Sequence, residues 1–571
     1  MPVVDTYDGW RLPVLTFKES LLLAATFALI VHAIYKRYET QPSSYVQTFL
    51  LLIFPPIVCA PFYLQTLHSL WISLFVSFSA FHSMLVTSII AYRLSPMHPL
   101  YQYPGPLVTK VSKLWMMYVT STGKMNEYVK SLHDQYGPYV RLGPNEISCI
   151  DTSVFQDIFG PSGMPKGPVW DARRNPDIAP SLISLRDLHE HARQRKAWNR
   201  AFSTAAVKDY EPIVAKRVLQ LAEVLEKESS EGAIDLARQF GYFAFDFMGD
   251  MAFGGGFELM RDGDKDGLWH LLEARVRNLA PLIHIPWATR LLLKIPSITG
   301  SVKKFRDFTV TCARRRKESG SSTKDLYYHL TNEEGAQVEA PTIESNLSNG
   351  ELAVVAGSDT TANALCGVFY YLLKHPHEHM RLREEVDRVF PRGEGDAVDA
   401  SKLAVMYILN AVINETLRLQ PGVPTYTERA PAKDSDGHWV GKRFIAEGTA
   451  VVCPIYTIHR DPANFSPYPN DFKPDRWLFK SADYPLQDSK STDEKCEWHT
   501  NASALMPFSI GPANCAGKNL ALAEMRAAVA VLVQRFDMKF ADGYDVGLYE
   551  KNVEDRFITQ VGELCVSLSL R

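Results

Sequence analysis

Several common sequence patterns are missing from this chain of 571 residues. Its eight cysteines include no Cys-x-x-Cys pair, which argues against a zinc site and favours reduced, cytosol-facing thiols over a disulfide framework. No long basic run accompanies the formal net charge of −3, so nucleic acid is not an expected partner. There is no internal repeat, and the predicted strands do not alternate regularly with helices, which argues against a doubly wound sheet.

Charged side chains are absent from residues 40–92. Within this stretch, residues 67–92 are long enough to cross a bilayer, whereas residues 49–64 are fewer and include three prolines, which indicate a weaker, kinked span. Another apolar segment, which comes first in the chain, covers residues 21–35. We therefore expect residues 1–94 to form an N-terminal membrane anchor of one to three transmembrane helices.

The positive charges beside these segments predict their topology. Lys36 and Arg37 follow the first segment, and Arg93 follows the third. If both clusters are cytosolic, the N-terminus is lumenal, the second and third segments form a hairpin, and everything after Arg93 is cytosolic. The alternative is a single span over residues 67–92 preceded by interfacial helices. Four prolines within residues 95–106 then predict a stiff, extended hinge.

Helical periodicity dominates from residue 107 to the C-terminus. The pattern predicts helices over residues 187–202, 234–252, 349–374, 378–389, 402–419 and 518–536. Short β-like runs occur at residues 139–142, 147–150, 450–452 and 565–570. The predicted fold class is therefore mainly α with a small β-sheet portion, and residues 107–571 form one large domain.

Cys515 is the first candidate for chemistry. It lies in a loop rich in glycine and proline, directly before the helix predicted over residues 518–536. The positive end of a helix dipole and its backbone N–H groups favour a thiolate, which suits a soft metal or haem iron. Taken alone, the cysteine is more simply interpreted as an inert core residue.

Polar residues interrupt the apolar helix predicted over residues 349–374. Asp359 and Thr360 would be buried there, and a buried acid and hydroxyl are costly unless they are satisfied or used. Gly357 lowers the helix propensity at the same point and would let the helix open. In a later helix, Glu-x-x-Arg spacing at residues 415–418 places two charges on one face, and a further arginine at position 476 lies in a proline-marked turn.

The order of these features resembles that of the cytochrome P-450 family of haem-thiolate monooxygenases. The acid–alcohol pair, the Glu-x-x-Arg motif, the later arginine and the cysteine before a helix follow one another as in that family, over about residues 100–571. The sequence also resembles those of fungal membrane-bound members of the family. The resemblance implies the P-450 fold preceded by N-terminal transmembrane helices, an endoplasmic reticulum membrane location, and a catalytic domain, residues 107–571, that faces the cytosol.

The resemblance also implies the cofactor, haem b, and the residues that bind it. Cys515 matches the cysteine whose thiolate is the axial ligand of the haem iron, and Phe508 and Gly511 match the loop around that cysteine. Ala356 and Gly357 match the small residues that leave room for oxygen above the haem.

Two further groups of residues have implied roles. Asp359 and Thr360 match the catalytic pair that delivers protons during oxygen activation. Glu415, Arg418 and Arg476 match a structural triad that supports the haem-binding core and is not catalytic.

Haem carries two propionate carboxylates, which need cations or donors from the protein. His191 and Arg195 match the family's propionate clamp, and Arg429 is a further candidate. One departure from the family pattern concerns this clamp. The position that holds an arginine in the loop before the cysteine is Ala513 here, so one expected cation is missing.

The resemblance implies a monooxygenase that inserts one oxygen atom from O2 into a lipophilic small molecule such as a terpenoid, a steroid or a polycyclic aromatic. Secondary metabolism and xenobiotic oxidation are both compatible with such substrates. Because the chain contains no dinucleotide fingerprint, electrons from NADPH must come through a separate NADPH–cytochrome reductase, with cytochrome b5 as an alternative donor.

Two other functions are open at this point. A reductase-independent haem-thiolate isomerase or peroxide-rearranging enzyme needs no proton delivery, and the presence of Asp359 and Thr360 argues against it. A non-catalytic haem-binding membrane protein is disfavoured by the intact Cys515 and the same pair.

Overall fold

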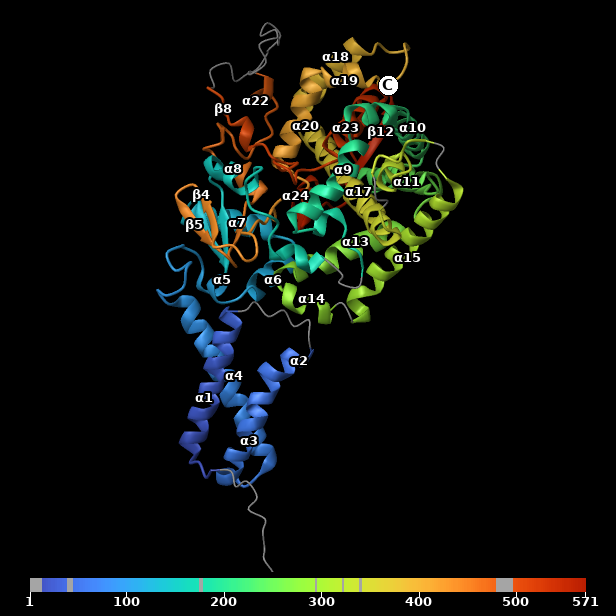
Figure 1. Ribbon diagram of the computed structural model, residues 1–571. Coiled ribbons are helices and arrows are strands. Elements are labelled where there is room, and N and C mark those ends of the chain that lie inside the picture. The colour runs from blue at the N-terminus through green and yellow to red at the C-terminus, as the bar shows by residue number, and fades with distance from the viewer. Residues whose placement is uncertain are drawn as a thin grey trace, which may run out of the picture. The chain divides into compact units, whose positions relative to one another are not determined.

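The computed structural model describes residues 13–37, 45–173, 178–292, 295–320, 323–337, 341–478 and 497–571 (Figure 1). The chain divides into two units, Met1–Ser112 and Lys113–Arg571, and each has its own packed interior.

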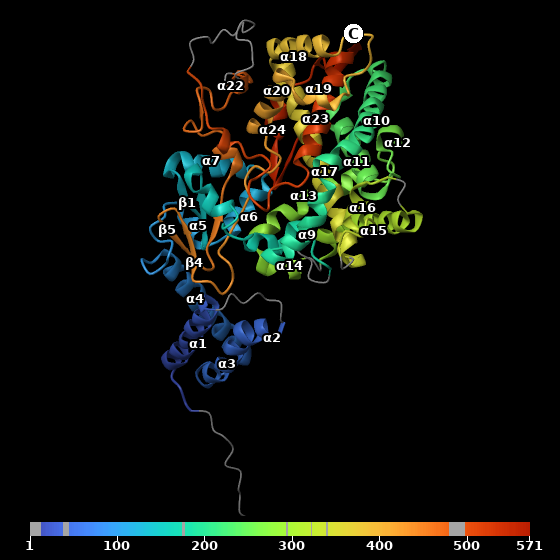
Figure 2. The ribbon, with the colours of Figure 1, turned by 45° about the horizontal axis from the view of Figure 1, so that its top comes forward.

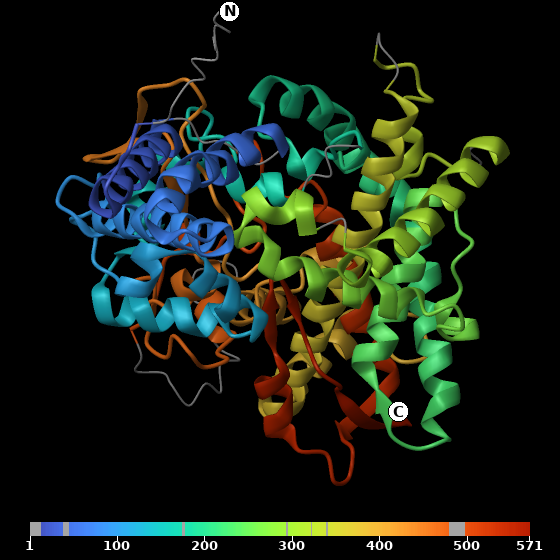
Figure 3. The ribbon, with the colours of Figure 1, turned by 90° about the horizontal axis from the view of Figure 1, so that it is seen from below.

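Three helices dominate the N-terminal unit: α1 (Phe17–Arg37), α3 (Phe54–Leu67) and α4 (Leu70–Leu94). They pack side by side, as the blue helices of Figures 1 and 3 show. Short segments α2 (Tyr45–Thr48) and a π-helical turn (Phe49–Ile53) lead into α3. Ser77 Oγ on α4 donates a hydrogen bond of 2.6 Å to the Pro56 carbonyl, which ties α4 to α3.

Among the described residues, three helices of this unit are long and apolar enough to cross a membrane: Phe17–Lys36, Val46–Leu67 and Leu70–Leu94. The second is longer than the segment predicted from sequence, because Pro55 and Pro56 occupy the first turn of α3, where an N–H group is not needed. Large apolar side chains such as Trp71 (80% exposed) and Phe75 (73% exposed) point outward, as suits a lipid environment.

Residues 95–103 form consecutive turns, so most of the stretch 95–106 does not run extended as expected. The His98 N–H donates to the Ser95 carbonyl over 3.1 Å, and the Tyr101 N–H donates to the His98 carbonyl over 2.9 Å. Proline fixes a backbone angle that turns share with extended chain, so both outcomes satisfy the same prolines. The helix α5 (Leu107–Val111) follows these turns.

The second unit is mainly helical with small sheets, which confirms the predicted fold class. Its first helices are α6 (Leu114–Ser121), α7 (Met125–Tyr136), α8 (Phe155–Phe159), α9 (Leu188–Ala201), α10 (Thr204–Ser229), α11 (Leu236–Phe253), α12 (Leu259–Asp262), α13 (Leu268–Leu279), α14 (Pro286–Leu292), α15 (Pro296–Ser319) and α16 (Leu326–Leu330). The later ones are α17 (Ile343–Lys374), α18 (Pro376–Val389), α19 (Ala400–Ala404), α20 (Tyr407–Leu419), α21 (Ile455–Ile458), α22 (Asp475–Leu478), α23 (Lys518–Arg535) and α24 (Val546–Asn552).

The strands form five small sheets among the described residues. One joins β1 (Tyr139–Gly143), β2 (Glu146–Cys149) and β6 (Ala450–Val452), and another joins β3 (Ile234–Asp235), β12 (Cys565–Leu570) and β9 (Phe536–Phe540). Three two-stranded pairs complete the set: β4 (Gly437–Val440) with β5 (Arg443–Ala446), β7 (Phe465–Ser466) with β8 (His499–Thr500), and β10 (Glu554–Arg556) with β11 (Ile558–Gln560). Figures 1 and 2 show β4 and β5 on the side of this unit opposite α10 and α15.

Helix α17 passes through the main hydrophobic core and packs along α11 (Figure 2). Its first turn is capped by the Thr342 side chain, which accepts a hydrogen bond of 3.2 Å from the Ser345 N–H. At Gly357, a Cβ atom would lie 2.4 Å from Met248 Sδ on α11. The glycine therefore allows the two helices to approach closely. The expected opening of the helix at this residue is not observed, because α17 runs unbroken over residues 343–374.

Glu415 on α20 forms a buried cluster with the two arginines predicted beside it. Arg418 Nη2 donates to Glu415 Oε1 over 2.8 Å, and Arg476 Nε donates to the same oxygen over 2.9 Å. All three side chains are fully buried. Burial alone would raise the pKa of Glu415, but the two guanidinium groups hold it below its ordinary value. Its contribution to stability is thus present above the ordinary carboxyl pKa and is lost as the pH falls through the lowered one.

Replacement of Glu415 by glutamine is expected to destabilise this unit by about 3–5 kcal/mol, because two buried guanidinium groups lose their counter-charge. Urea denaturation of the full chain in detergent measures the loss. The control is Glu550→Gln, which breaks a 2.7 Å pair with Lys374 that is half-exposed. That control is expected to cost less than about 1 kcal/mol. Equal losses in the two variants would contradict the assigned role of the cluster.

Candidate active site

A cavity of about 310 Å³ lies in the second unit between α17 and the loop that precedes α23. Most of its wall is apolar, with Trp170, Leu182, Ile183, Leu352, Val423 and Phe557 among the lining residues. It brings together predicted residues from distant parts of the sequence: Cys515, Phe508, Thr360, Ala356, Gly357, His191, Arg195 and Arg429. Gly511 and Asp359 lie behind its wall, whereas Glu415, Arg418 and Arg476 belong to the separate buried cluster.

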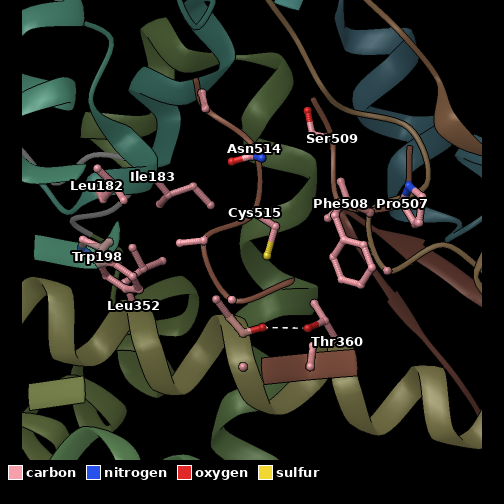
Figure 4. A pocket seen from close by; sticks show the side chains of 18 of the residues that line it. Leu182, Ile183, Trp198, Leu352, Thr360, Pro507, Phe508, Ser509, Asn514 and Cys515 are labelled. Carbon is pink, nitrogen blue, oxygen red and sulfur yellow. Dashed lines mark hydrogen bonds between the residues drawn. The ribbon is translucent and has the colours of Figure 1, made fainter. Parts of the chain in front are cut away.

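The loop that carries Cys515 is held by its own backbone and by a close contact with α8. The Cys515 N–H donates to the Phe508 carbonyl over 2.9 Å. Gly511 has φ +76°, and a Cβ atom there would lie 1.8 Å from the Phe159 carbonyl oxygen. Glycine is required at this position on both counts. The loop therefore presents Cys515 to the cavity, next to Phe508 and Asn514 (Figure 4).

Cys515 is the exposed cysteine among those that the structure describes, and its thiol points into the cavity (Figure 4). Burial within the domain raises the pKa of this thiol. The backbone N–H groups of Gly517 and Lys518, at the start of α23, and the charge of Arg195 act in the opposite direction. These donors surround the sulfur as a thiolate ligand requires.

Thr360 faces Cys515 from α17, across the cavity (Figure 4). Its Oγ1 donates a hydrogen bond of 2.8 Å to the Ala356 carbonyl one turn earlier. Asp359 is fully buried beside it, and burial raises the pKa of its carboxyl group to about 7. One carboxyl oxygen accepts a hydrogen bond of 3.4 Å from Gln560 Nε2, and the other has no partner among the described residues. The carboxyl can therefore gain or lose a proton near neutral pH.

Arg195, expected in the propionate clamp, lines the cavity and donates hydrogen bonds to two asparagines. Its Nη1 donates to the Asn514 carbonyl over 2.6 Å, and its Nη2 donates to Asn514 Oδ1 over 2.8 Å. Nε donates to Asn199 Oδ1 over 2.8 Å. The guanidinium thus grips the residue that precedes Cys515, although it also lines the cavity.

Cationic side chains gather on one wall of the cavity without acidic partners. Among the described residues, neither Arg195 nor Arg429 makes a salt bridge to a carboxylate, and the same holds for Lys166, a lining residue not predicted from sequence. Burial lowers the pKa of Arg429 to about 10. Burial and these three cations lower the pKa of His191 to about 4, so its ring is neutral at pH 7. This wall can accept an anionic ligand.

Comparison with known proteins decides the family. The sequence model described as "Cytochrome P450" matches residues 102–560. The chain belongs to the cytochrome P450 family. It is 32% identical to "Cytochrome P450 67" of Uromyces fabae, over 95% of this chain and 97% of that protein. It is also 32% identical to the "Tryprostatin B 6-hydroxylase" of Aspergillus fumigatus, over 85% of this chain and 83% of that one.

A third relative, a cytochrome P450 monooxygenase of Eupenicillium brefeldianum, is 31% identical over 82% of this chain and 91% of that protein. This P450 is accordingly an oxidoreductase of the monooxygenase class, and its family implies a haem-thiolate cofactor. The residues of the cavity fit such a group. A thiol with thiolate-favouring donors lies on one wall, small residues Ala356 and Gly357 lie on α17, and cations without acidic partners can meet carboxylates.

Several residues of this P450 site were not found by sequence reasoning. Lys166, Asn514 and Gln560 contact the predicted residues from other segments, and Phe159 supplies the carbonyl against Gly511. Asn514 directly precedes Cys515, but the other three residues stand in no recognisable local pattern, and all four acquire these neighbours only through the fold.

Substitution of Gly511 by alanine is expected to displace the Cys515 loop, because the added methyl group collides with the Phe159 carbonyl. The absorbance of protein-bound haem per mole of purified protein measures the effect, and we expect most of it to be lost. Gly543→Ala is the matched control, since Gly543 also has a positive φ (+81°) but has nothing within 4 Å of a Cβ atom. Haem content that falls equally in both variants would show that backbone strain, rather than this contact, is responsible.

Proposed function

We propose that this P450 inserts one oxygen atom from O2 into a lipophilic small molecule, with electrons that come from NADPH through a separate reductase. The observation that carries the proposal is one apolar cavity with the Cys515 thiol on one wall and the Thr360 hydroxyl on the opposite wall. The protonatable Asp359 lies directly behind Thr360. A thiolate ligand and a proton source on opposite sides of a cofactor are what oxygen activation needs.

Each residue has a separate task in this proposal. Cys515 would hold the haem iron through its thiolate, and the bound haem supplies the activation of O2. The Asp359 carboxyl and Thr360 Oγ1 carry protons into the cavity, because a group that titrates near pH 7 can both take up and release them. Ala356 and Gly357 keep the facing wall free of side-chain bulk.

The walls of the cavity support a lipophilic substrate. Its lining is mainly aliphatic and aromatic, so binding would depend on apolar burial with few polar contacts. Relatives of this chain include fungal monooxygenases, and one of them is a hydroxylase of tryprostatin B. We infer a substrate of fungal secondary metabolism, with terpenoid-like or other polycyclic apolar compounds as the first to screen. Xenobiotic oxidation is the second candidate role.

The N-terminal helices support attachment to a membrane, and we propose the endoplasmic reticulum with the catalytic unit on the cytosolic side. Lys36 and Arg37 at the end of α1 and Arg93 at the end of α4 would lie in the cytosol under the positive-inside rule. That side also provides access to an NADPH–cytochrome reductase or to cytochrome b5.

Cys515→Ser is expected to abolish the carbon-monoxide difference band typical of a haem-thiolate protein, because a serine hydroxyl does not supply a thiolate to iron. The spectrum of the reduced protein under carbon monoxide measures this. Cys565→Ser, at a half-buried cysteine outside the cavity lining, should keep the band. A normal band in Cys515→Ser would overturn the assignment of the iron ligand.

Thr360→Ala is expected to keep the haem spectrum and to consume NADPH, but to release hydrogen peroxide in place of oxidised product. Acid–base groups contribute about 10²–10⁴-fold in rate, so product per NADPH should fall strongly without reaching zero. Thr360→Ser retains the hydroxyl and should keep the ratio of the parent. An unchanged ratio in Thr360→Ala would show that Thr360 only packs in the helix.

A further inference from the structure

Lys166 is a buried lysine whose ammonium group borders the cavity. The side chain is 8% exposed and lies among the lining residues. Its Nζ donates to the Leu182 carbonyl over 2.9 Å and to the Ile183 carbonyl over 2.8 Å. Two of its three N–H groups therefore have acceptors among the described residues. Both acceptors are neutral, so neither supplies a counter-charge.

The neighbours of Lys166 increase the need for an anion. Lys166 and Arg429 face each other across an isolated antiparallel bridge, where like charges repel. Burial, together with the guanidinium groups of Arg429 and Arg195, lowers the pKa of Lys166 to about 7. A cluster of cations in a desolvated cavity is costly unless a negative ligand neutralises it.

The two arginines of this wall also donate to groups of the protein. Three donors of Arg195 are used by Asn514 and Asn199, and one donor of Arg429 is used by the Glu428 carbonyl. Ala513 lines the same cavity and offers only a methyl group. The ammonium group of Lys166 comes from a different segment, and one of its three N–H groups has no acceptor among the described residues, so it is available to an anion in this cavity.

We propose, on the basis of the haem-binding function proposed above, that Lys166 binds a propionate carboxylate of the haem and supplies the charge that is missing at Ala513. The segment that carries Lys166 precedes α9, whereas Ala513 lies in the Cys515 loop. The cation would thus come from a different segment of the cavity lining. Its carbonyl contacts with Leu182 and Ile183 hold the ammonium in place for this contact.

The test is the retention of haem by the holoenzyme of Lys166→Gln. Glutamine can still donate to the Leu182 and Ile183 carbonyls but carries no charge. Transfer of haem to an excess of apomyoglobin gives the dissociation rate, which we expect to rise about 10- to 100-fold, as for the loss of one charge-assisted hydrogen bond. Resonance Raman bands of the propionate groups, which respond to hydrogen bonding at the carboxylates, should shift as well.

Two further variants separate this role from a general effect on the fold. Lys113→Gln removes another largely buried lysine, which pairs with Glu146 at 2.6 Å and is not in the cavity lining, so it should leave the propionate bands unchanged. The double variant Lys166→Gln/Ala513→Arg returns a cation to the loop and should restore haem retention. It also provides the measurement if the single variant yields no holoprotein.

A parent-like dissociation rate in Lys166→Gln would overturn the proposal, and so would faster loss with unchanged propionate bands, because the lysine would then act only on residues 182–183. A double variant that still loses haem would contradict it too. The haem-binding function is judged separately, by the thiolate band of the parent protein. Absence of that band in the parent would refute the function itself and with it the role of Lys166.

Discussion

Buried charged groups occur in two different settings in the catalytic unit of this P450. At Glu415, one carboxylate lies between two guanidinium groups, and further donors of Arg418 reach backbone carbonyls, so the charge of the carboxylate is met within the chain. At the cavity wall, Arg429 and Lys166 have no acidic partner among the described residues. The first arrangement stabilises the fold, and the second leaves positive charge for a ligand to match. The buried carboxylate of the fold is therefore balanced by residues of the chain, whereas the cations of the cofactor site need a bound anion.

Most of the helical framework could be predicted from the sequence, because burial imposes a 3.6-residue period on each amphipathic or core helix. The predictions over residues 187–202 and 518–536 agree with α9 and α23 within two residues. The predicted helix over residues 402–419 is instead two helices, since Asp399 caps the short α19 and a second helix starts only at Tyr407. Caps and breaks of this kind depend on local side-chain contacts that periodicity does not contain.

The site was predictable to the extent that it follows ordered motifs. Cys515 and Thr360 stand in motifs that keep their order along the chain, and the fold brings both to one cavity. The environment that sets their behaviour was not predictable. Gln560 meets Asp359 from a strand about two hundred residues later in the chain, and Lys166 lies in a segment with no distinctive pattern. Such pairings arise only when distant segments pack together.

The grip of Arg195 on Asn514 has a mechanical consequence. The guanidinium holds both the carbonyl and the side chain of the residue next to Cys515, through hydrogen bonds of 2.6 and 2.8 Å. The Arg195 side chain thus links helix α9 directly to the residue that precedes Cys515. Arg193 and Lys196 are exposed on the outer face of α9, so a single side chain, that of Arg195, connects this exposed helix with the backbone beside the sulfur.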